Sequence, residues 1–284
     1  MIEISKKTLI ICSIVRNAEK GLRKNVPVLK ELSRQFLNCK IFIYENDSID
    51  GTKQLLMEWS DSDSAHVFVS LNDNDSSATI PSQKETGKVN CFYSARRINK
   101  MAQLRNHYMN YVEQQNWDAD YLMVVDLDVS RLSLNGILSC FDKDDDWDAV
   151  SAFGYSLAPN MRKRYHDTYA LIEYGNENQP QTIEKIQSLA RKYGKLRGTK
   201  DWIRVCSAFG GLAIYKFEAV KGLRYYVLPN DDERVEVRCE HYSIYKQMQE
   251  KGYLRVFINP QMEIKYQDVD FDLIIKTIKR KLGL

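Results

Sequence analysis

The chain lacks several features by which a protein class is readily recognised. Its 284 residues contain no internal repeat and no segment with the composition of a linker. No run approaches the roughly 20 apolar residues of a membrane-spanning helix. Met1–Lys7 leads directly into a short apolar segment, which is typical of a first strand and not of a signal peptide. We therefore expect a cytoplasmic protein made of one large α/β domain, residues 1–284.

Paired cysteines and a strong charge bias are also missing. Lys and Arg exceed Asp and Glu by a net charge of only +3, which is too weak a bias for general nucleic-acid binding, so we expect no nucleic-acid partner. The 6 cysteines show no Cys-x-x-Cys spacing, which argues against a zinc site and indicates a reducing compartment. They are Cys12, Cys39, Cys91, Cys140, Cys206 and Cys239.

The most informative segment that is present is the apolar run Tyr121–Val125, which stops at Asp126 and Asp128. A short run of this kind predicts a strand buried on both faces of a parallel sheet. Ligands bind at the carboxyl ends of such strands, and paired carboxylates are typical ligands of hard divalent cations. The alternative is a strand that merely ends in two solvated acids.

The first half of the chain alternates between strand and helix patterns, which predicts a doubly wound, mostly parallel sheet flanked by helices. Pro27 lies inside the first helical pattern and is expected to divide it. The polar stretch Asn72–Asn90 is too long for an ordinary connection and indicates an insertion or a lid. The predicted strands are Thr8–Val15, Lys40–Tyr44 and His66–Leu71, and the predicted helices are Asn17–Leu37, Lys53–Ser60 and Ala95–Gln115.

The second half has a less regular pattern, and we expect it to belong to the same domain. Ile203–Lys216 reads as a strand-like run with Gly210 and Gly211 inside it, where glycine indicates a bulge or a close approach to a ligand. The other predicted elements are the strands Ala149–Gly154 and Leu254–Ile258 and the helices Ile183–Tyr193 and Glu240–Lys251.

Arg105 is the most unusual residue of the helix Ala95–Gln115. It lies seven positions after Ile98, on the stripe that also carries Ala102 and Met109, so its guanidinium is expected to face inward. A buried guanidinium requires an anionic partner. That partner is either a structural carboxylate or the Asp126 cluster and a bound diphosphate, with Asn106 as a hydrogen-bonding companion.

Two loops and one histidine complete the set of candidate residues. Arg16 and Asn17 end the first strand, and Glu45 and Asp47 follow the second, so both loops reach the edge where a nucleoside would lie. Ordinary turn and helix-capping chemistry is an equally good explanation for these loops. His241 directly follows Glu240, which is a common arrangement in metal and acid–base sites but weak evidence alone.

Several segments, taken together and in order, resemble the GT-A glycosyltransferases, most closely the capsule-associated α-mannosyltransferases of fungi. The resemblance covers roughly Leu9 to Lys251. We expect the chain to depart from those relatives in lacking an N-terminal membrane anchor, and His241 has no match among their motifs. The matching segments are Tyr44–Thr52, Arg97-Ile98, Arg105-Asn106, Val125–Val129, Tyr165–Leu171, Ser207–Gly211 and Cys239-Glu240.

The resemblance implies a GT-A, Rossmann-like sheet and a metal-dependent transfer of a hexose, with mannose as a candidate, from a UDP- or GDP-hexose to a glycan or lipid-linked acceptor. It implies Mn²⁺ or Mg²⁺ held by Asp128, with Asp126 helping through water or the ribose, and retention of the anomeric configuration. His241, which lies outside the resemblance, is the candidate for a third metal ligand. Glu240 is the candidate to orient or deprotonate the acceptor hydroxyl, and Asp167 is its rival. The residues expected to bind the nucleotide sugar are Arg16, Asn17, Glu45, Asp47, Arg97, Arg105, Asn106, Asp126, Gly210 and Gly211.

The same resemblance divides the domain into a nucleotide-sugar-binding half, 1–130, an acceptor-binding half, 131–260, and a C-terminal tail, 261–284. On a helix, five apolar residues of this tail would share one face bordered by lysines and an arginine: Phe271, Ile274, Ile275, Ile278 and Leu282. Such a segment either docks on the domain or lies on an anionic membrane, which would give a protein peripheral to the membrane.

Two other functions fit part of the pattern. Phosphatases of the haloacid dehalogenase type also end an apolar strand in Asp-x-Asp, but here three predicted strands precede the motif and no Gly-Asp-x-x-x-Asp follows. A non-catalytic carbohydrate-binding protein with the same fold would bind sugar or nucleotide without turnover. The pair Asp126 and Asp128 favours the enzyme.

Overall fold

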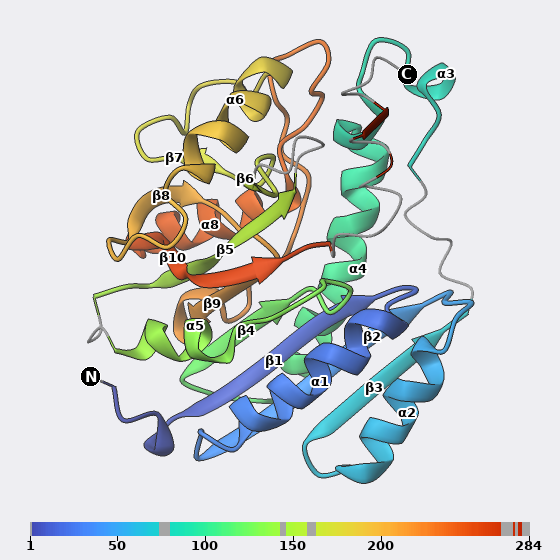
Figure 1. Ribbon diagram of the computed structural model, residues 1–284, viewed down its shortest axis with the longest axis vertical. Coiled ribbons are helices and arrows are strands. Elements are labelled where there is room, and N and C mark those ends of the chain that lie inside the picture. Colours follow the sequence, from blue (N-terminus) through green and yellow to red (C-terminus); the bar gives the residue numbers. More distant parts are fainter. Residues whose placement is uncertain are drawn as a thin grey trace.

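The computed structural model describes residues 2–73, 80–142, 146–157 and 163–267, together with residues 275, 278 and 279. Within these residues a single sheet has the strand order β3-β2-β1-β4-β9-β5-β10-β8-β7, and β6 pairs with β5 (Figure 1). The strands are β1 (Thr8–Val15), β2 (Asn38–Asn46), β3 (Val67–Asn72), β4 (Tyr121–Val125), β5 (Ala149–Leu157), β6 (Lys163–Tyr165), β7 (Ile172–Glu173), β8 (Ile203–Ser207), β9 (Leu212–Lys216) and β10 (Val256–Lys265).

The sheet is mostly parallel on the side built by the first half of the chain. β3, β2, β1 and β4 all run in the same direction. β9 then lies antiparallel between β4 and β5, and β10 runs parallel to β5. The predicted α/β class, a largely parallel sheet flanked by helices, is confirmed. The carboxyl ends of β1, β2 and β4 therefore meet at one edge of the sheet, where the candidate residues were expected.

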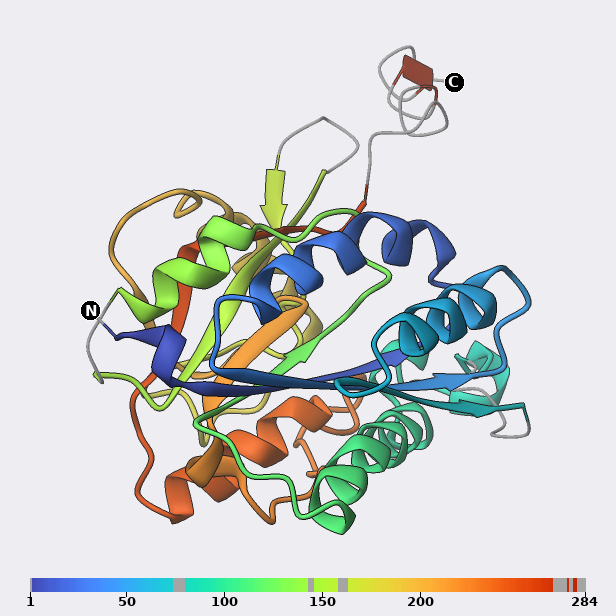
Figure 2. The same ribbon diagram turned by 90° about the horizontal axis from the view of Figure 1, so that it is seen from below.

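Helices cover both faces of the sheet, as Figure 2 shows with the sheet seen almost along its plane. α1, α2 and α5 lie on one face, and α4, α7 and α8 lie on the other. The helices are α1 (Glu19–Ser33), α2 (Thr52–Ser62), α3 (Gln83–Thr86), α4 (Ala95–Gln114), α5 (Leu134–Leu138), α6 (Ile183–Gly194), α7 (Phe217–Val220) and α8 (Glu240–Glu250), with short 3₁₀ turns η1 (Ile4–Lys6), η2 (Cys91–Tyr93) and η3 (Ser139–Phe141).

The alternation of side chains along β1 divides the core into two layers. Leu9 and Ile11 pack on the side of α1 and α2, whereas Ile10 and Cys12 pack on the side of α4 and α8. All four are buried. A strand that is apolar on both faces can lie only between two layers of helices, which is why the chain needs both.

Two sequence expectations were wrong in detail. Pro27 does not divide the first helix, because α1 continues through it from Glu19 to Ser33. Pro27 cannot donate one backbone hydrogen bond, but burial of the apolar side of the helix, which includes Leu22 and Leu29, outweighs this loss of stability. The run Ile203–Lys216 is two strands, β8 and β9, because the chain turns between them. Part of the long polar stretch, residues 74–79, lies outside the described residues, as does most of the C-terminal tail.

Candidate active site

The loop after β4 is held in place by α1. A Cβ atom on Gly21 would lie 2.1 Å from the carbonyl oxygen of Leu127, so only glycine allows the helix to approach this closely. The buried Asn25 amide donates to the carbonyl oxygen of Val129 over 2.7 Å and accepts from the N–H of Leu132 over 3.1 Å. The N–H of Asp126 donates to the carbonyl oxygen of Gly211 over 2.8 Å. The two aspartates therefore sit on a fixed backbone.

Arg105 lies at the centre of this edge of the sheet, as its place on the helix stripe predicts. Its side chain is 5% exposed, and its Nε donates to Oε1 of Glu240 on α8 over 2.9 Å. Its Nη2 lies 3.7 Å from Oδ1 of Asp126. The guanidinium also lies over the ring of Phe209, 5.0 Å from its centroid. Both proposed partners of Arg105 are thus present, a carboxylate from another helix and the Asp126 cluster.

The carboxyl groups around Arg105 have very different proton affinities. Burial raises the pKa of Asp126 to about 8, against the opposing effect of Arg105. Burial, and the nearby charge of Glu240, likewise raise the pKa of Asp167 to about 7. Burial alone would raise the pKa of Glu240, but the positive charge and the hydrogen bond of the neighbouring Arg105 hold it well below its usual range. Glu240 is consequently an anion at neutral pH, whereas Asp126 and Asp167 each change protonation state near neutral pH.

His241 is buried, and neither of its ring nitrogens has a hydrogen-bond partner among the residues that the structure describes. Its ring stacks on Phe209 with centroids 3.8 Å apart, and Nε2 lies 3.7 Å from Oε1 of Glu240. Burial and the charge of Arg105 hold the pKa of His241 well below its usual value, so the ring is neutral. Neutral imidazole is the form that binds metals. Because the His241 ring carries no charge, Arg105 is the positive group that keeps Glu240 ionised.

These groups line one cleft of about 560 Å³ between α4 and the second half of the chain. Six of the predicted residues come together in it: Arg97, Arg105, Asp126, Asp167, Glu240 and His241. His166 and Tyr266, to which the sequence analysis gave no role, also line the cleft, with ring centroids 3.7 Å apart. The sequence could not show that these two residues meet, because only the fold brings residues so far apart in the chain to one wall of the cleft.

The description "Cryptococcal mannosyltransferase 1" belongs to the family model that matches residues 8–246 of this chain. The chain belongs to this family. This membership gives no support to the haloacid dehalogenase alternative. A search of curated proteins found no match.

Several solved structures are similar to this chain at low identity. The mannosyltransferase PcManGT from Pyrobaculum calidifontis, solved with GDP-Man and Mn²⁺, is 12% identical over 98% of this chain and 65% of that chain, with a TM-score of 0.48. GalNAc-T7, solved with UDP, GalNAc and Mn²⁺, is 12% identical over 92% of this chain and 44% of its own, with a TM-score of 0.47. S. aureus TarS 1–349 is 12% identical over 90% of this chain and 59% of that chain, with a TM-score of 0.46. This chain spans less than two thirds of each, and likeness at this level says nothing about its sugar donor or acceptor.

Four predicted residues of this mannosyltransferase-family chain lie at the ends of β1 and β2 instead of in the cleft. Oδ1 of Asn17 accepts from the N–H of Ile49 over 2.9 Å, and Oε1 of the buried Glu45 accepts from the N–H of Ser48 over 2.7 Å. Asn17 and Asp47 both have positive φ values, 51° and 52°, and Arg16 is exposed. These contacts show turn chemistry that shapes the two loops. Binding of a nucleotide by the four residues stays a prediction.

Asn106 and the two glycines have packing roles that the sequence did not reveal. The amide of Asn106 donates to the carbonyl oxygen of Tyr225 and accepts from the Tyr225 N–H, both over 2.8 Å, which ties α4 to the segment before α8. Gly210 and Gly211 both have positive φ, and a Cβ atom on Gly210 would lie 2.3 Å from the carbonyl oxygen of Ala152. The close approach is to β5, and contact of these residues with a sugar donor stays a prediction.

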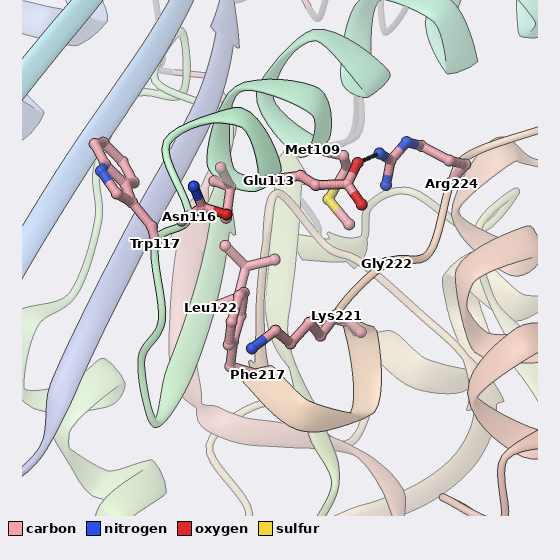
Figure 3. Close-up of a pocket in the computed structure, with 11 residues that line it drawn as sticks. Met109, Glu113, Asn116, Trp117, Leu122, Phe217, Lys221, Gly222 and Arg224 are labelled. Carbon is pink, nitrogen blue, oxygen red and sulfur yellow. Dashed lines mark hydrogen bonds and ion pairs between the residues drawn. The ribbon is translucent and has the colours of Figure 1, made fainter.

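A smaller cavity of about 200 Å³ lies at the opposite end of β4, near Leu122 (Figure 3). Figure 3 shows Glu113 and Arg224 paired at its rim and Met109 and Phe217 on its walls. It contains no cluster of carboxylates, so the candidate chemistry belongs to the cleft. In the described part of the chain, no helix combines the length and apolarity needed to cross a bilayer.

Proposed function

We propose that this protein transfers a hexose, mannose being the first candidate, from a nucleotide sugar to a hydroxyl group of a glycan or lipid-linked acceptor. The observation that carries the proposal is Arg105, a buried guanidinium held between Asp126 and Glu240 in the cleft of a mannosyltransferase-family chain. A fixed positive charge in a buried site stabilises the charge that develops on a leaving nucleoside diphosphate. Glu240 holds that charge in position, because both of its oxygens are already used, by Arg105 and by Cys239.

The chemistry of the cleft suits a divalent cation. Asp126 lines the cleft and Asp128 is exposed two residues further along the fixed loop. Among the described residues no three His, Cys, Asp or Glu side chains are arranged to hold a metal ion. Mg²⁺ and Mn²⁺ sites of transferases often take one or two carboxylates and complete their coordination with substrate phosphates, so a pair of aspartates fits. When bound, Mn²⁺ or Mg²⁺ would act as a Lewis acid on the diphosphate. His241, with two unpartnered ring nitrogens, is the third candidate ligand.

Asp167 is better suited than Glu240 to take a proton from the acceptor hydroxyl. A general base works best with a pKa near the working pH, and the pKa of Asp167 is raised to about 7 whereas that of Glu240 is held well below its usual range. The N–H of Gly210 donates to Oδ2 of Asp167 over 3.1 Å and fixes its orientation. Retention of configuration, which the family resemblance implies, requires no strong base, and Asp167 would then orient the hydroxyl group.

A thermal-shift panel tests the proposal. We expect one of GDP-mannose, UDP-hexoses or CMP-sugars to raise the melting temperature with Mn²⁺, and to do so less when EDTA is present. Asp128→Asn should abolish the metal-dependent part of the shift, because a neutral amide is a poor ligand for a hard cation. Asp118→Asn is the matched control, since the Asp118 side chain is 75% exposed and pairs with Lys221.

The same panel separates the competing outcomes. Transfer of the sugar from the stabilising nucleotide to methyl glycosides or water establishes the enzyme. Binding without any turnover would favour the non-catalytic carbohydrate-binding protein. A panel in which no nucleotide sugar shifts the wild-type protein, with or without Mn²⁺, refutes the proposal.

A further inference from the structure

Phe92 is an exposed aromatic side chain at the mouth of the cleft. It lies in η2, directly before α4, and is 52% exposed. Tyr93 and Arg97 line the cleft beside it. We propose that Phe92 is the platform of an acceptor subsite on which the apolar C–H face of a pyranose ring stacks. This inference rests on the proposed function and adds the class of acceptor, a sugar ring in contact with an aromatic side chain.

The segment that carries Phe92 is fixed in place before any ligand binds. The N–H of Asn90 donates to the carbonyl oxygen of Arg234 over 2.9 Å, and the N–H of Ala95 donates to Oε2 of Glu236 over 2.7 Å. Nη1 of Arg97 donates to the carbonyl oxygen of Phe92 over 3.0 Å. A ring exposed on a tethered turn loses little conformational freedom when it binds, which is the property of a preorganised contact.

Polar and aromatic groups next to Phe92 supply what a sugar ring needs around its edge. The Arg97 guanidinium lies 6.0 Å from the centroid of Phe92, within reach of hydroxyl groups on a stacked ring. Tyr93 and Tyr169 lie with ring centroids 4.6 Å apart, and the hydroxyl of Tyr169 donates to the carbonyl oxygen of Val237 over 2.6 Å. An apolar surface bordered by a few placed polar groups is typical of small-ligand sites.

The position of the platform points to the acceptor and not to the nucleoside. The described residues that line the cleft include Thr168 and Ala190 from the second half of the chain, but none from the loops at 16–17 and 45–50. Those loops lie at the carboxyl ends of β1 and β2, whereas Phe92 lies at the start of α4, the end of that helix near α3 in Figure 1. Arg105 and Asp126 line the same cleft as Phe92, so a sugar on Phe92 would lie on the side of the reacting centre that those loops do not form.

Tyr174 provides a matched control. It is 54% exposed, it has the guanidinium of Arg204 over its ring at 4.0 Å, and it does not line the cleft. Phe92→Ala, Phe92→Trp and Tyr174→Ala are compared with the wild type by saturation-transfer NMR, with methyl α-mannopyranoside, methyl α-glucopyranoside and methyl β-galactopyranoside as probes. Both rings are exposed, so we expect all variants to keep the wild-type melting temperature.

We expect Phe92→Ala to weaken binding of at least one pyranoside by about tenfold or more, because it removes the stacking surface. Phe92→Trp and Tyr174→Ala should stay within about twofold of the wild type, and so should the affinity of all variants for the nucleotide sugar. Unchanged pyranoside binding by Phe92→Ala, or no pyranoside binding by the wild type, overturns the platform. Weakened nucleotide-sugar binding by Phe92→Ala also overturns it and places the ring at the nucleoside. Failure of every nucleotide sugar to bind the wild type refutes the proposed function instead, and the pyranoside measurements still decide the platform.

Discussion

At the residue scale, the pairing of Arg105 with Glu240 is a buried ion pair whose two members depend on each other. We expect Arg105→Met to lower the free energy of unfolding by about 3–5 kcal/mol, because it leaves the Glu240 carboxylate buried without a partner. Chemical denaturation measures the loss. The double variant Arg105→Met/Glu240→Gln should recover part of it, since it removes the unpaired charge as well.

The exposed pair of Arg34 and Glu31 is the control for that experiment, with side chains 73% and 48% exposed. Arg34→Met should change the free energy of unfolding by less than about 1 kcal/mol. If the effects of the Arg105 and Glu240 substitutions on the free energy of unfolding simply added, the two groups would not be energetically coupled. That result would contradict the role of Glu240 in positioning Arg105.

Asp167 carries a second prediction at this scale. We expect Asp167→Asn to lower kcat by about 100-fold or more while the affinity for the nucleotide sugar changes little, because its proposed contact is with the acceptor hydroxyl. In the wild type, kcat should rise with pH around the raised pKa of about 7, and the variant should lose this rise. Calorimetry with the nucleotide sugar separates binding from turnover. A variant that loses affinity for the sugar donor and keeps kcat contradicts the assignment.

At the scale of elements, the turn between β8 and β9 brings Gly210 against β5. We expect Gly210→Ala to be destabilising by at least about 2 kcal/mol more than Gly175→Ala, as judged by urea unfolding. Both glycines have positive φ, so alanine strains the backbone at each. Only Gly210 has backbone within reach of the added Cβ, the carbonyl oxygen of Ala152 at 2.3 Å, whereas no atom lies within 4 Å at Gly175. Equal effects would show that the close approach to β5 is unimportant for stability.

At the scale of the whole molecule, the raised pKa values of Asp126 and Asp167 affect stability. A carboxyl group whose pKa is higher in the folded than in the unfolded chain stabilises the fold at low pH, and this contribution is lost as pH rises through the folded pKa. The relevant values are about 8 and about 7, against 3.8 for an unperturbed aspartate. In EDTA, the contribution of these two groups to the free energy of unfolding should therefore fall as pH rises from about 4 to about 8 and level off above that.

Asp126→Asn should flatten this fall, because the amide imitates the protonated carboxyl group. His166 has the opposite effect in the lower part of this range: burial lowers its pKa to about 4, so its contribution to stability is lost as pH falls below about 6.5, and only the two aspartates act above that pH. Denaturation curves at several pH values measure both effects. A wild-type stability that rises between about pH 6.5 and 8.5 would contradict the assigned proton affinities.

Association with membranes is also a property of the whole molecule, and we propose that the protein is cytoplasmic and peripheral to an anionic membrane. In the C-terminal tail, residues 261–267, 275, 278 and 279 are described, and Ile278 is 51% exposed. The remaining tail residues, which include Phe271 and Ile274 of the predicted apolar face, lie outside the described residues. We expect full-length protein to float with anionic liposomes at low salt and protein truncated after Asp270 to remain behind. Equal flotation of the two proteins would exclude a role for the tail.

The sequence alone determined the elements and one charged group. Period-two and period-3.6 patterns are local, so β1 and β4 begin and end as predicted, and the spacing of Arg105 from Ile98 placed it inward. The ordered motifs indicated the family that the match over residues 8–246 then established. Local patterns also indicated the pair Asp126 and Asp128 as candidate site residues, because the end of a strand can be recognised from one short stretch of sequence.

Only the tertiary structure decided which residues meet. Arg105 and Glu240 are 135 positions apart, so no spacing in the sequence could have paired them. The same holds for Asn106 with Tyr225 and for Gly210 with Ala152. Asn106 and Gly210 were predicted to contact a ligand, and the structure shows a hydrogen bond and a backbone contact within the protein. The proton affinities of Asp126, Asp167 and Glu240 differ for the same reason. A pKa depends on burial and on neighbouring charges, and both are set by the packing of α4 and α8 against the sheet.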